Sequence, residues 1–312
     1  MSTDVVAAVD IGGTKIAAGL VDDTGRVRHQ IQVATPAGPA AIVEVVAELV
    51  TGLRSRAVVR AVGVGAPGVI DPAAGVVRSA TDILPGWAGT PIRELLAARL
   101  GLPVAVINDV GAAAVGAARG PELRGYPEIL HVSVGTGIGG ALIRNGQLVS
   151  GPHAVAGAVA HLLVPVAGVI PCGCGRFDHL EAVAAGPAIA AAIAKETGSA
   201  PLPLTGAIRV PGAEAVIAAA ARLLGRTLAG LVCAVDVDAV ALGGGVVHGV
   251  PGFAGLVRDA LHAEALAPLR TLPVLVPGAG ADAPLLGAAH LARQTVAGAD
   301  ARHLARQTGV HP

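Results

Sequence analysis

Two glycine-threonine turns between apolar segments constrain the fold of this chain more than any other feature. The first lies in AAVDIGGTKIAAGLVD, residues 7–22, and the second in HVSVGTGIGGALIRNG, residues 131–146. Each segment is typical of a strand, a tight turn and a second strand. Because glycine lets the backbone approach a ligand and exposes its N–H groups, such turns can bind an anion. Either turn alone fits a plain hairpin equally well, whereas the pair favours a duplicated domain that holds one polyphosphate from both sides.

Length and charge restrict the class of protein. The chain has 312 residues, enough for two domains of ordinary size. Its formal net charge is zero, so there is no electrostatic case for nucleic acid or an anionic membrane as partner. The segment most like a membrane span, residues 228–247, is interrupted by Asp236 and Asp238, which would be costly inside a bilayer. No signal sequence is recognised at the start, and we expect a cytoplasmic protein.

The order of apolar segments predicts an α/β fold, because strands alternate with helices. Strands are expected over residues 4–10, 16–22, 58–64, 104–107, 239–242 and 274–276, and a strand-turn-strand unit over 131–149. Helices are expected over 42–53, 90–100, 112–118, 181–196, 213–235 and 253–264, with a last one from about Pro284.

The turn at Gly135–Gly140 formally contains G-x-G-x-x-G, the fingerprint of dinucleotide-binding domains. That fingerprint must open a helix and be followed by an acidic residue about twenty positions later. Here residues 141–143 are typical of a strand, and no acidic residue lies near position 160. A dinucleotide site is therefore disfavoured, and phosphate binding by the two turns is favoured.

Asn108 and Asp109 follow the expected strand 104–107. In open α/β sheets, ligands bind at the carboxyl ends of the strands. A carboxylate there can accept the proton of a hydroxyl that attacks a γ-phosphate. The alternative for Asp109 is a cap on the helix expected at 112–118.

A second group of chemically active side chains consists of His161, Cys172, Cys174 and His179. Two thiolates and two imidazoles match a tetrahedral zinc site, although the spacing differs from a zinc finger, and a pair of reduced surface cysteines is the alternative. Glu181 follows at an expected helix start, where it could simply complement the helix dipole. Three cysteines make no disulfide framework, and we expect the third, Cys233, to be buried in an apolar helix.

Taken in order, these segments resemble the ROK (repressor, ORF, kinase) family of sugar kinases and repressors. The resemblance covers essentially the whole chain and implies two domains of the actin-like, ribonuclease H-like ATPase fold with a ligand cleft between them. It rests on Asp10–Lys15, Gly65–Gly68 with Asp71, Leu84–Trp87, Asn108–Asp109, Gly135–Gly140, Cys172–Gly175, Leu180–Glu181, Leu242–Val246 and Ala281–Ala289.

The resemblance also implies roles for individual residues. Asp109 would be the general base that takes the proton of the sugar 6-hydroxyl. Sugar contacts would come from Gly68, Asn108, His161 and Glu181. The ATP phosphates and Mg²⁺ would face Asp10, Gly12, Gly13, Thr14 and Lys15, the second turn would add Gly135, Thr136 and Gly137, and Gly243, Gly244 and Gly245 would lie by the adenosine. A structural Zn²⁺ would be bound by His161, Cys172, Cys174 and His179.

The implied organisation is an N-terminal domain over residues 1–117, completed by the C-terminal helix at about 290–312, and a C-terminal domain over 118–289 with a zinc loop at 151–181. Family members are commonly homodimers. Two departures from the family pattern concern the ligands: Ala158 replaces an acidic residue or histidine that binds sugar, and His179 replaces the usual last cysteine of the zinc site.

The function implied is an ATP-dependent hexose or hexosamine 6-kinase, of the glucokinase or the N-acetylmannosamine or N-acetylglucosamine kinase type. One alternative is a non-catalytic sugar-binding or regulatory member of the family. Another is a kinase for an unusual aminosugar such as kanosamine, and polyphosphate as phosphoryl donor is a further option.

Overall fold

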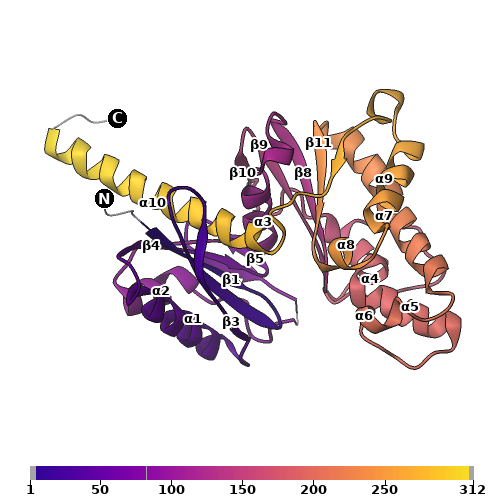
Figure 1. The fold of residues 1–312 in the computed structure, drawn as a ribbon, viewed down its shortest axis with the longest axis horizontal. Coiled ribbons are helices and arrows are strands. Elements are labelled where there is room, and N and C mark those ends of the chain that lie inside the picture. Colours follow the sequence, from indigo (N-terminus) through magenta and orange to yellow (C-terminus); the bar gives the residue numbers. More distant parts are fainter. Residues whose placement is uncertain (1–4, 82, 309–312) are drawn as a thin grey trace. The chain divides into compact units, whose positions relative to one another are not determined.

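The computed structural model describes residues 5–81 and 83–308, and the chain forms two compact units (Figure 1). Unit 1 takes the chain up to Ala117, together with Gly151–Ala154 and the chain from Ala281. Unit 2 takes Ala118–Ser150 and Val155–Gly280. Each unit contains one five-stranded sheet, in agreement with the predicted α/β class.

The sheet of unit 1 has the order β3-β2-β1-β4-β7. Its strands are β1 (Val5–Ile11), β2 (Lys15–Val21), β3 (Val27–Ala34), β4 (Val59–Ala66) and β7 (Val104–Asn108). β1, β2 and β3 pair antiparallel, whereas β1, β4 and β7 pair parallel. β1 is apolar on both faces because helices cover both sides of the sheet.

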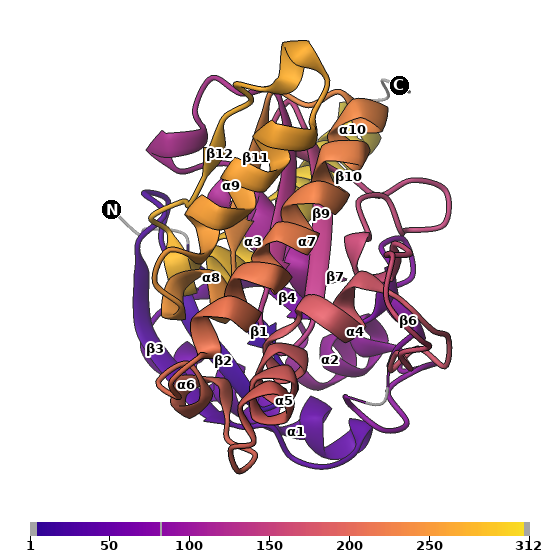
Figure 2. The ribbon, with the colours of Figure 1, turned by 90° about the vertical axis from the view of Figure 1, so that its right-hand side faces the viewer.

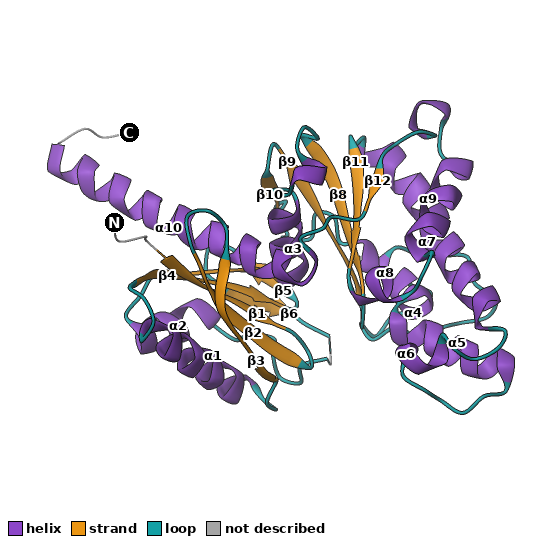
Figure 3. Ribbon diagram, viewed as in Figure 1, coloured by secondary structure: helices purple, strands orange, loops and turns teal. Residues whose placement is uncertain are grey.

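Successive residues of β1 point to opposite layers. Val5, Ala7 and Val9 pack in the core with α1 (Pro39–Arg54) and α2 (Ile92–Leu100). Val6 and Ala8 pack against α10 (Ala283–Thr308), which also contacts α3 (Asp109–Ala117) (Figure 3).

α10 and α3 approach each other through glycines. A Cβ on Gly287 would lie 1.8 Å from the carbonyl oxygen of Ala112, and a Cβ on Gly116 would lie 1.9 Å from that of Ala283. No side chain fits at these distances, so the two helices are in contact backbone to backbone.

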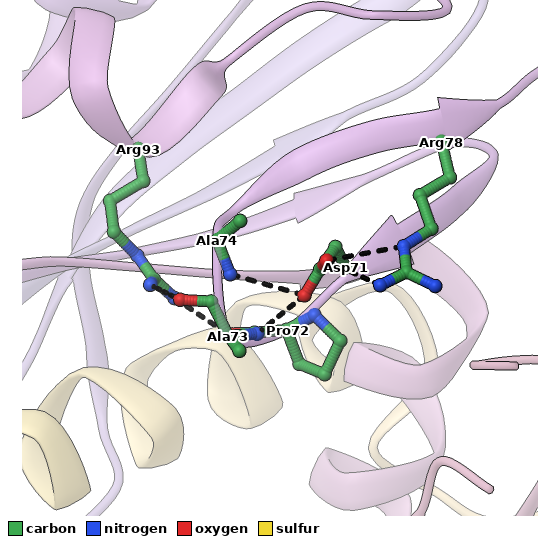
Figure 4. A network of polar contacts seen from close by, with 6 residues as sticks. All are labelled: Asp71, Pro72, Ala73, Ala74, Arg78 and Arg93. Atoms are coloured by element: carbon green, nitrogen blue, oxygen red, sulfur yellow. Dashed lines mark hydrogen bonds and ion pairs between the residues drawn. The ribbon is translucent and has the colours of Figure 1, made fainter. Parts of the chain in front are cut away.

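A polar network fixes a small hairpin in unit 1, formed by β5 (Val69–Asp71) and β6 (Val76–Ser79) (Figure 4). Asp71 Oδ1 accepts two backbone N–H groups of the following turn, at 2.9 and 3.1 Å, and Asp71 Oδ2 accepts from Arg78 Nη2 at 2.6 Å. The hydrogen bond from Arg78 lowers the pKa of Asp71. Arg93 of α2 donates to the carbonyls of Pro72 and Ala73 and thereby ties the hairpin to the helix layer.

The sheet of unit 2 has the order β10-β9-β8-β11-β12 and thus repeats the arrangement of unit 1, three antiparallel strands followed by two parallel ones. Its strands are β8 (Glu128–Val134), β9 (Ile138–Arg144), β10 (Gln147–Val149), β11 (Ala239–Gly243) and β12 (Val274–Leu275). The helices of this unit are α4 (Leu180–Ala184), α5 (Gly186–Thr197), α6 (Leu204–Ala207), α7 (Ala213–Val235), α8 (Gly245–Gly249) and α9 (Phe253–Glu264). Figure 2 shows α7 and α9 over this sheet.

By length and composition, α7 is apolar enough to cross a membrane. Its residues Leu224, Leu228 and Val232 are buried in the core of unit 2, where α7 packs beside α9. α7 is therefore a core helix, and it ends at Val235, before Asp236.

Two expectations about this unit are wrong. The helix expected over 181–196 is two helices, because the backbone is extended at Ala185 and Pro187 lacks the N–H that would continue the preceding turn. Cys233, expected to be buried, is exposed because it lies on the outer face of α7.

Candidate functional site

Two acidic side chains flank the carboxyl end of strand β4 in unit 1. Asp10 lies on β1 and Asp109 directly follows β7, on either side of β4. A Cβ on Gly65 of β4 would lie 3.5 Å from both Asp10 Oδ1 and Asp109 Cα. A methyl group at position 65 would fill the space between the two acidic residues and would come closest to Ala112 Cβ, at 3.3 Å, whereas glycine leaves this space open.

The surroundings of both carboxyl groups disfavour their ionised forms. Burial, and then the negative charge of Asp109, raise the pKa of Asp10 to about 7, while the Lys15 ammonium opposes the shift. Burial also raises the pKa of Asp109. Carboxyl groups with raised pKa values beside one another are typical of sites that handle protons or bind a cation.

Hydrogen bonds orient the side chain of Asp109. Its Oδ1 accepts from Asn108 Nδ2 at 2.8 Å and from the Val110 N–H at 2.9 Å. Among the described residues, none donates a hydrogen bond to Oδ2. Asn108 Oδ1 accepts the Gly111 N–H at 3.0 Å, so Asn108, and not Asp109, caps α3. Asn108 Nδ2 also donates to the carbonyl of Gly68 at 3.0 Å.

The first glycine-threonine turn joins β1 to β2. Gly12 N–H donates to the carbonyl of Lys15 at 2.9 Å, and Thr35 Oγ1 donates to the carbonyl of Gly12 at 2.7 Å. Gly13, Thr14 and Lys15 are exposed. The turn is thus fixed at its base and exposed at its tip, where Ile83 lies beside Gly13 and Lys15 Nζ donates to Gln32 Oε1 at 3.4 Å.

In unit 2, the second turn opens onto a cavity of about 550 Å³. The turn itself contributes Gly135 and Thr136, and α8 contributes Gly245. The walls are mostly apolar and include Pro187, Ala190, Leu202 and Leu204. The strand β9 follows the turn, in agreement with the sequence argument against a dinucleotide fingerprint.

Residues 201–204 were not predicted as part of a site. Their sequence, Pro-Leu-Pro-Leu, has no periodicity or charge that would mark a ligand contact, and only the fold brings them to the turn.

His161, Cys172, Cys174 and His179 come together in the loop region before α4. Their ligand atoms all lie within 4.8 Å of one another. The distance from Sγ to Nδ1 is 3.2 Å between Cys174 and His179 and 4.0 Å between Cys172 and His161. In tetrahedral zinc sites, metal-ligand bonds place sulfur and nitrogen about 3.5 Å apart, so this donor set fits zinc. Burial raises the pKa of the Cys172 thiol, and a bound cation would favour its thiolate.

The structure carries the predicted site residues on both units. Unit 1 groups Asp10, the Gly12–Lys15 turn, Gly68 and Asn108–Asp109. Unit 2 groups Gly135–Gly137, Gly243–Gly245, the four-residue cluster and Glu181, which lies in the first turn of α4.

This chain resembles known proteins of one family along most of its length. A model of the ROK family matches residues 6–295. A glucokinase of Streptomyces coelicolor is 39% identical over 181 residues, which make up 58% of this chain and 56% of the glucokinase, so the alignment spans little more than half of that relative. An N-acetylmannosamine kinase of Escherichia fergusonii is 34% identical over 291 residues, 92% of this chain and 97% of that kinase.

Among solved structures, a ROK family glucokinase from Streptomyces griseus in complex with glucose and AMPPNP is 32% identical and has a TM-score of 0.81. The match covers 93% of this chain and 99% of that chain. It confirms the predicted α/β fold class, and the two mixed sheets are consistent with two actin-like ATPase domains. Since the family model covers nearly the whole chain and a relative at 34% identity aligns along most of it, the chain belongs to the ROK family.

Proposed function

We propose that this chain is an ATP-dependent sugar kinase that transfers the γ-phosphate to the 6-hydroxyl of a hexose or hexosamine. The observation that carries the proposal is the Asp109 carboxylate, fixed through Oδ1 at the end of β7 while Oδ2 has no donor among the described residues. The glucokinase and N-acetylmannosamine kinase relatives support the same class of reaction.

In this mechanism Asp109 is the general base. Its carboxylate accepts the proton of the sugar 6-hydroxyl as that oxygen forms its bond to the γ-phosphorus. The bond from the γ-phosphorus to the bridging oxygen breaks, and ADP leaves with that oxygen. The raised pKa of Asp109 makes it a stronger base than an exposed carboxylate, and Asn108 holds it in one orientation.

We assign phosphate binding to the two turns, through the N–H groups of Gly12–Lys15 and Gly135–Gly137 and the Lys15 ammonium. The purine would lie in the cavity beside Gly243–Gly245. A buried carboxylate such as Asp10, beside a second one, suits a hard cation, and Mg²⁺ bound there would neutralise charge on the phosphoryl group being transferred.

We propose that His161, Cys172, Cys174 and His179 hold one structural zinc ion. His179 takes the place of the cysteine usual in the family, and an imidazole is an equally good zinc ligand. Metal analysis of the purified protein should give about one zinc per chain. The His179→Ala variant should no longer retain zinc, whereas the His179→Cys variant should still retain it.

The sugar itself is less constrained. Gly68, Asn108, His161 and Glu181 are our proposed sugar contacts, but the exposed Ala158 offers no polar group where the family commonly has one. An unbound hydroxyl at that position costs about 1–3 kcal/mol of binding. This favours a substrate that differs from glucose in its hydrogen-bonding groups, such as an aminosugar, as the second candidate.

The decisive experiment is ADP release from zinc-loaded protein with Mg-ATP against hexoses, N-acetylhexosamines and free aminosugars. We expect clear turnover with at least one sugar, and Asp109→Asn should lower kcat by about 1,000-fold or more while the sugar still binds in calorimetry. Asp259→Asn, which changes an exposed carboxylate on α9, should leave kcat unchanged. Sugar binding without turnover in the wild-type protein would instead support a non-catalytic sugar-binding protein.

Two further proposals concern the molecule in the cell. We propose a homodimer in the cytoplasm, as is common in the family. Analytical ultracentrifugation at micromolar concentration should give twice the chain mass of 30.4 kDa.

A further inference from the structure

Glu181 makes a contact that sugar binding does not require. Its Oε2 accepts the Ile138 N–H at 2.9 Å, directly after the turn Gly135–Gly137. A Cβ on Gly137 would lie 2.5 Å from the same oxygen. The carboxylate therefore rests against the turn that we assign to phosphate binding.

The turn is also held from the start of α5. Gly186 N–H donates to the carbonyl of Gly135 at 2.8 Å, and Gly135 N–H donates to the carbonyl of Gly137 at 2.8 Å. Glu181 lies in the first turn of α4, and Gly186 begins α5 two residues after α4 ends, so both external supports of the turn depend on where α4 lies.

α4 has five residues, too few to be a stable helix without its neighbours. The residue before its first turn is His179, a member of the four-residue cluster, and Leu180 N–H donates to the carbonyl of Leu162 at 2.9 Å. His161, another member of the cluster, directly precedes Leu162. The cluster thus brackets the start of α4, two residues before Glu181.

We infer that Glu181 is a positioning residue that links the metal cluster to the phosphate-facing turn, so that loss of the metal weakens nucleotide binding. The inference rests on the proposed function, because it assigns the turn to nucleotide phosphates. It gives the cluster a role beyond local stability: the metal keeps α4, Glu181 and the Ile138 N–H in the arrangement that holds the turn.

The test measures nucleotide affinity by calorimetry with Mg-AMPPNP and no sugar. Glu181→Ala should weaken binding roughly tenfold, the loss expected for one hydrogen bond to a charged group. Glu181→Gln keeps an acceptor oxygen and should restore most of the affinity. Gly137→Ala should weaken binding as Glu181→Ala does, because its methyl group displaces the carboxylate, and the φ of Gly137 lies outside the left-handed region.

Metal-stripped wild-type protein should show the same loss of nucleotide affinity. Removing the metal from the Glu181→Ala variant should weaken binding little further, because both changes disrupt the same contact between Glu181 and the turn. Zinc content is measured for each variant, and Glu181→Ala must retain the metal. The control Glu214→Ala removes an exposed carboxylate from α7 and should bind like the wild type. Amide exchange at Ile138 supplies a second readout without nucleotide, and it should accelerate in Glu181→Ala and in stripped protein.

Wild-type affinity and unchanged Ile138 exchange in Glu181→Ala would overturn this inference alone. Wild-type protein that binds no nucleotide would contradict the proposed function as well. Stripped protein that binds nucleotide normally would show that the metal does not act through Glu181.

Discussion

Asp10 keeps a carboxyl group where the surrounding structure disfavours its charge. Burial and the charge of Asp109 raise its pKa to about 7, and Lys15 offsets only part of this shift. An isosteric amide would avoid the cost of the buried charge. The Asp10 carboxylate therefore does not stabilise the folded protein. Its role in the proposed mechanism, where it faces a cation and phosphates, accounts for the free-energy cost of burying its charge.

Replacing Asp10 by asparagine should stabilise the protein and inactivate it. Because folding raises the pKa of Asp10, its protonation stabilises the folded state. This contribution is complete below the unfolded pKa, near 4, and is lost as the pH rises through 7. We therefore expect Asp10→Asn to raise the free energy of unfolding by about 2 kcal/mol at pH 8 and much less at pH 4. Urea unfolding at the two pH values measures this, with exposed Asp23→Asn as control, and unchanged stability at pH 8 would contradict it.

The sequence places Asn108 and Asp109 at the end of a strand, but it does not tell which of them caps α3. Both side chains can accept a helix N–H, and the outcome depends on backbone geometry that makes Asn108 reach Gly111. The hydrogen bond from the Ile138 N–H to Glu181 could not be predicted from the sequence for another reason. It joins residues 43 positions apart, and only the packing of α4 against the turn creates it.

Secondary structure elements with a clear apolar period were predicted well. The helix expected over 253–264 is α9, and β1, β2 and α7 match their expected ranges within about a residue. β3 was not predicted, because as an exposed edge strand it carries no buried alternating pattern and is defined by its pairing with β2. α3 begins at Asp109, three residues before its expected start, because Asn108 supplies the cap.

The contact between α10 and α3 should tolerate no side chain. Gly287→Ala would place a methyl group 1.8 Å from the Ala112 carbonyl oxygen, so the helices must separate, and we expect a loss of about 3 kcal/mol in the free energy of unfolding. Gly52→Ala, in α1, meets nothing within 4 Å and should stabilise by about 0.5 kcal/mol. Urea unfolding of both variants tests this, and equal effects would contradict the close approach.

At the scale of the whole molecule, the two units should respond to acid in opposite directions. Unit 1 contains Asp10, whose raised pKa makes the folded state gain stability as pH falls below 7. Unit 2 contains His131 on β8, buried with Nδ1 unpartnered, and burial lowers its pKa to about 4. Because the unfolded histidine binds a proton near pH 6.5 and the folded one does not, unit 2 loses stability as pH falls from 6.5 towards 4.

Between pH 7.5 and 5, each of these contributions amounts to about 2 kcal/mol. Opening free energies from amide exchange, corrected for the intrinsic rate, should rise in β1 and β4 and fall in β8 and β11. His131→Leu should remove the fall in unit 2 and leave unit 1 unaffected. If the opening free energy of unit 2 fell by the same amount in His131→Leu, groups other than His131 would cause the acid sensitivity.

The packing of α10 also sets an order of events during synthesis. Val6, Ala8 and Ala61 of unit 1 are covered by Leu285 and Ala288, which the ribosome makes more than two hundred residues later. The N-terminal segment of unit 1, which ends at Ala117, therefore has one apolar face of its sheet uncovered while unit 2 is synthesised and folds. Although domains ordinarily fold from the N-terminus onwards as they are made, here the first unit to be started is the last to be finished.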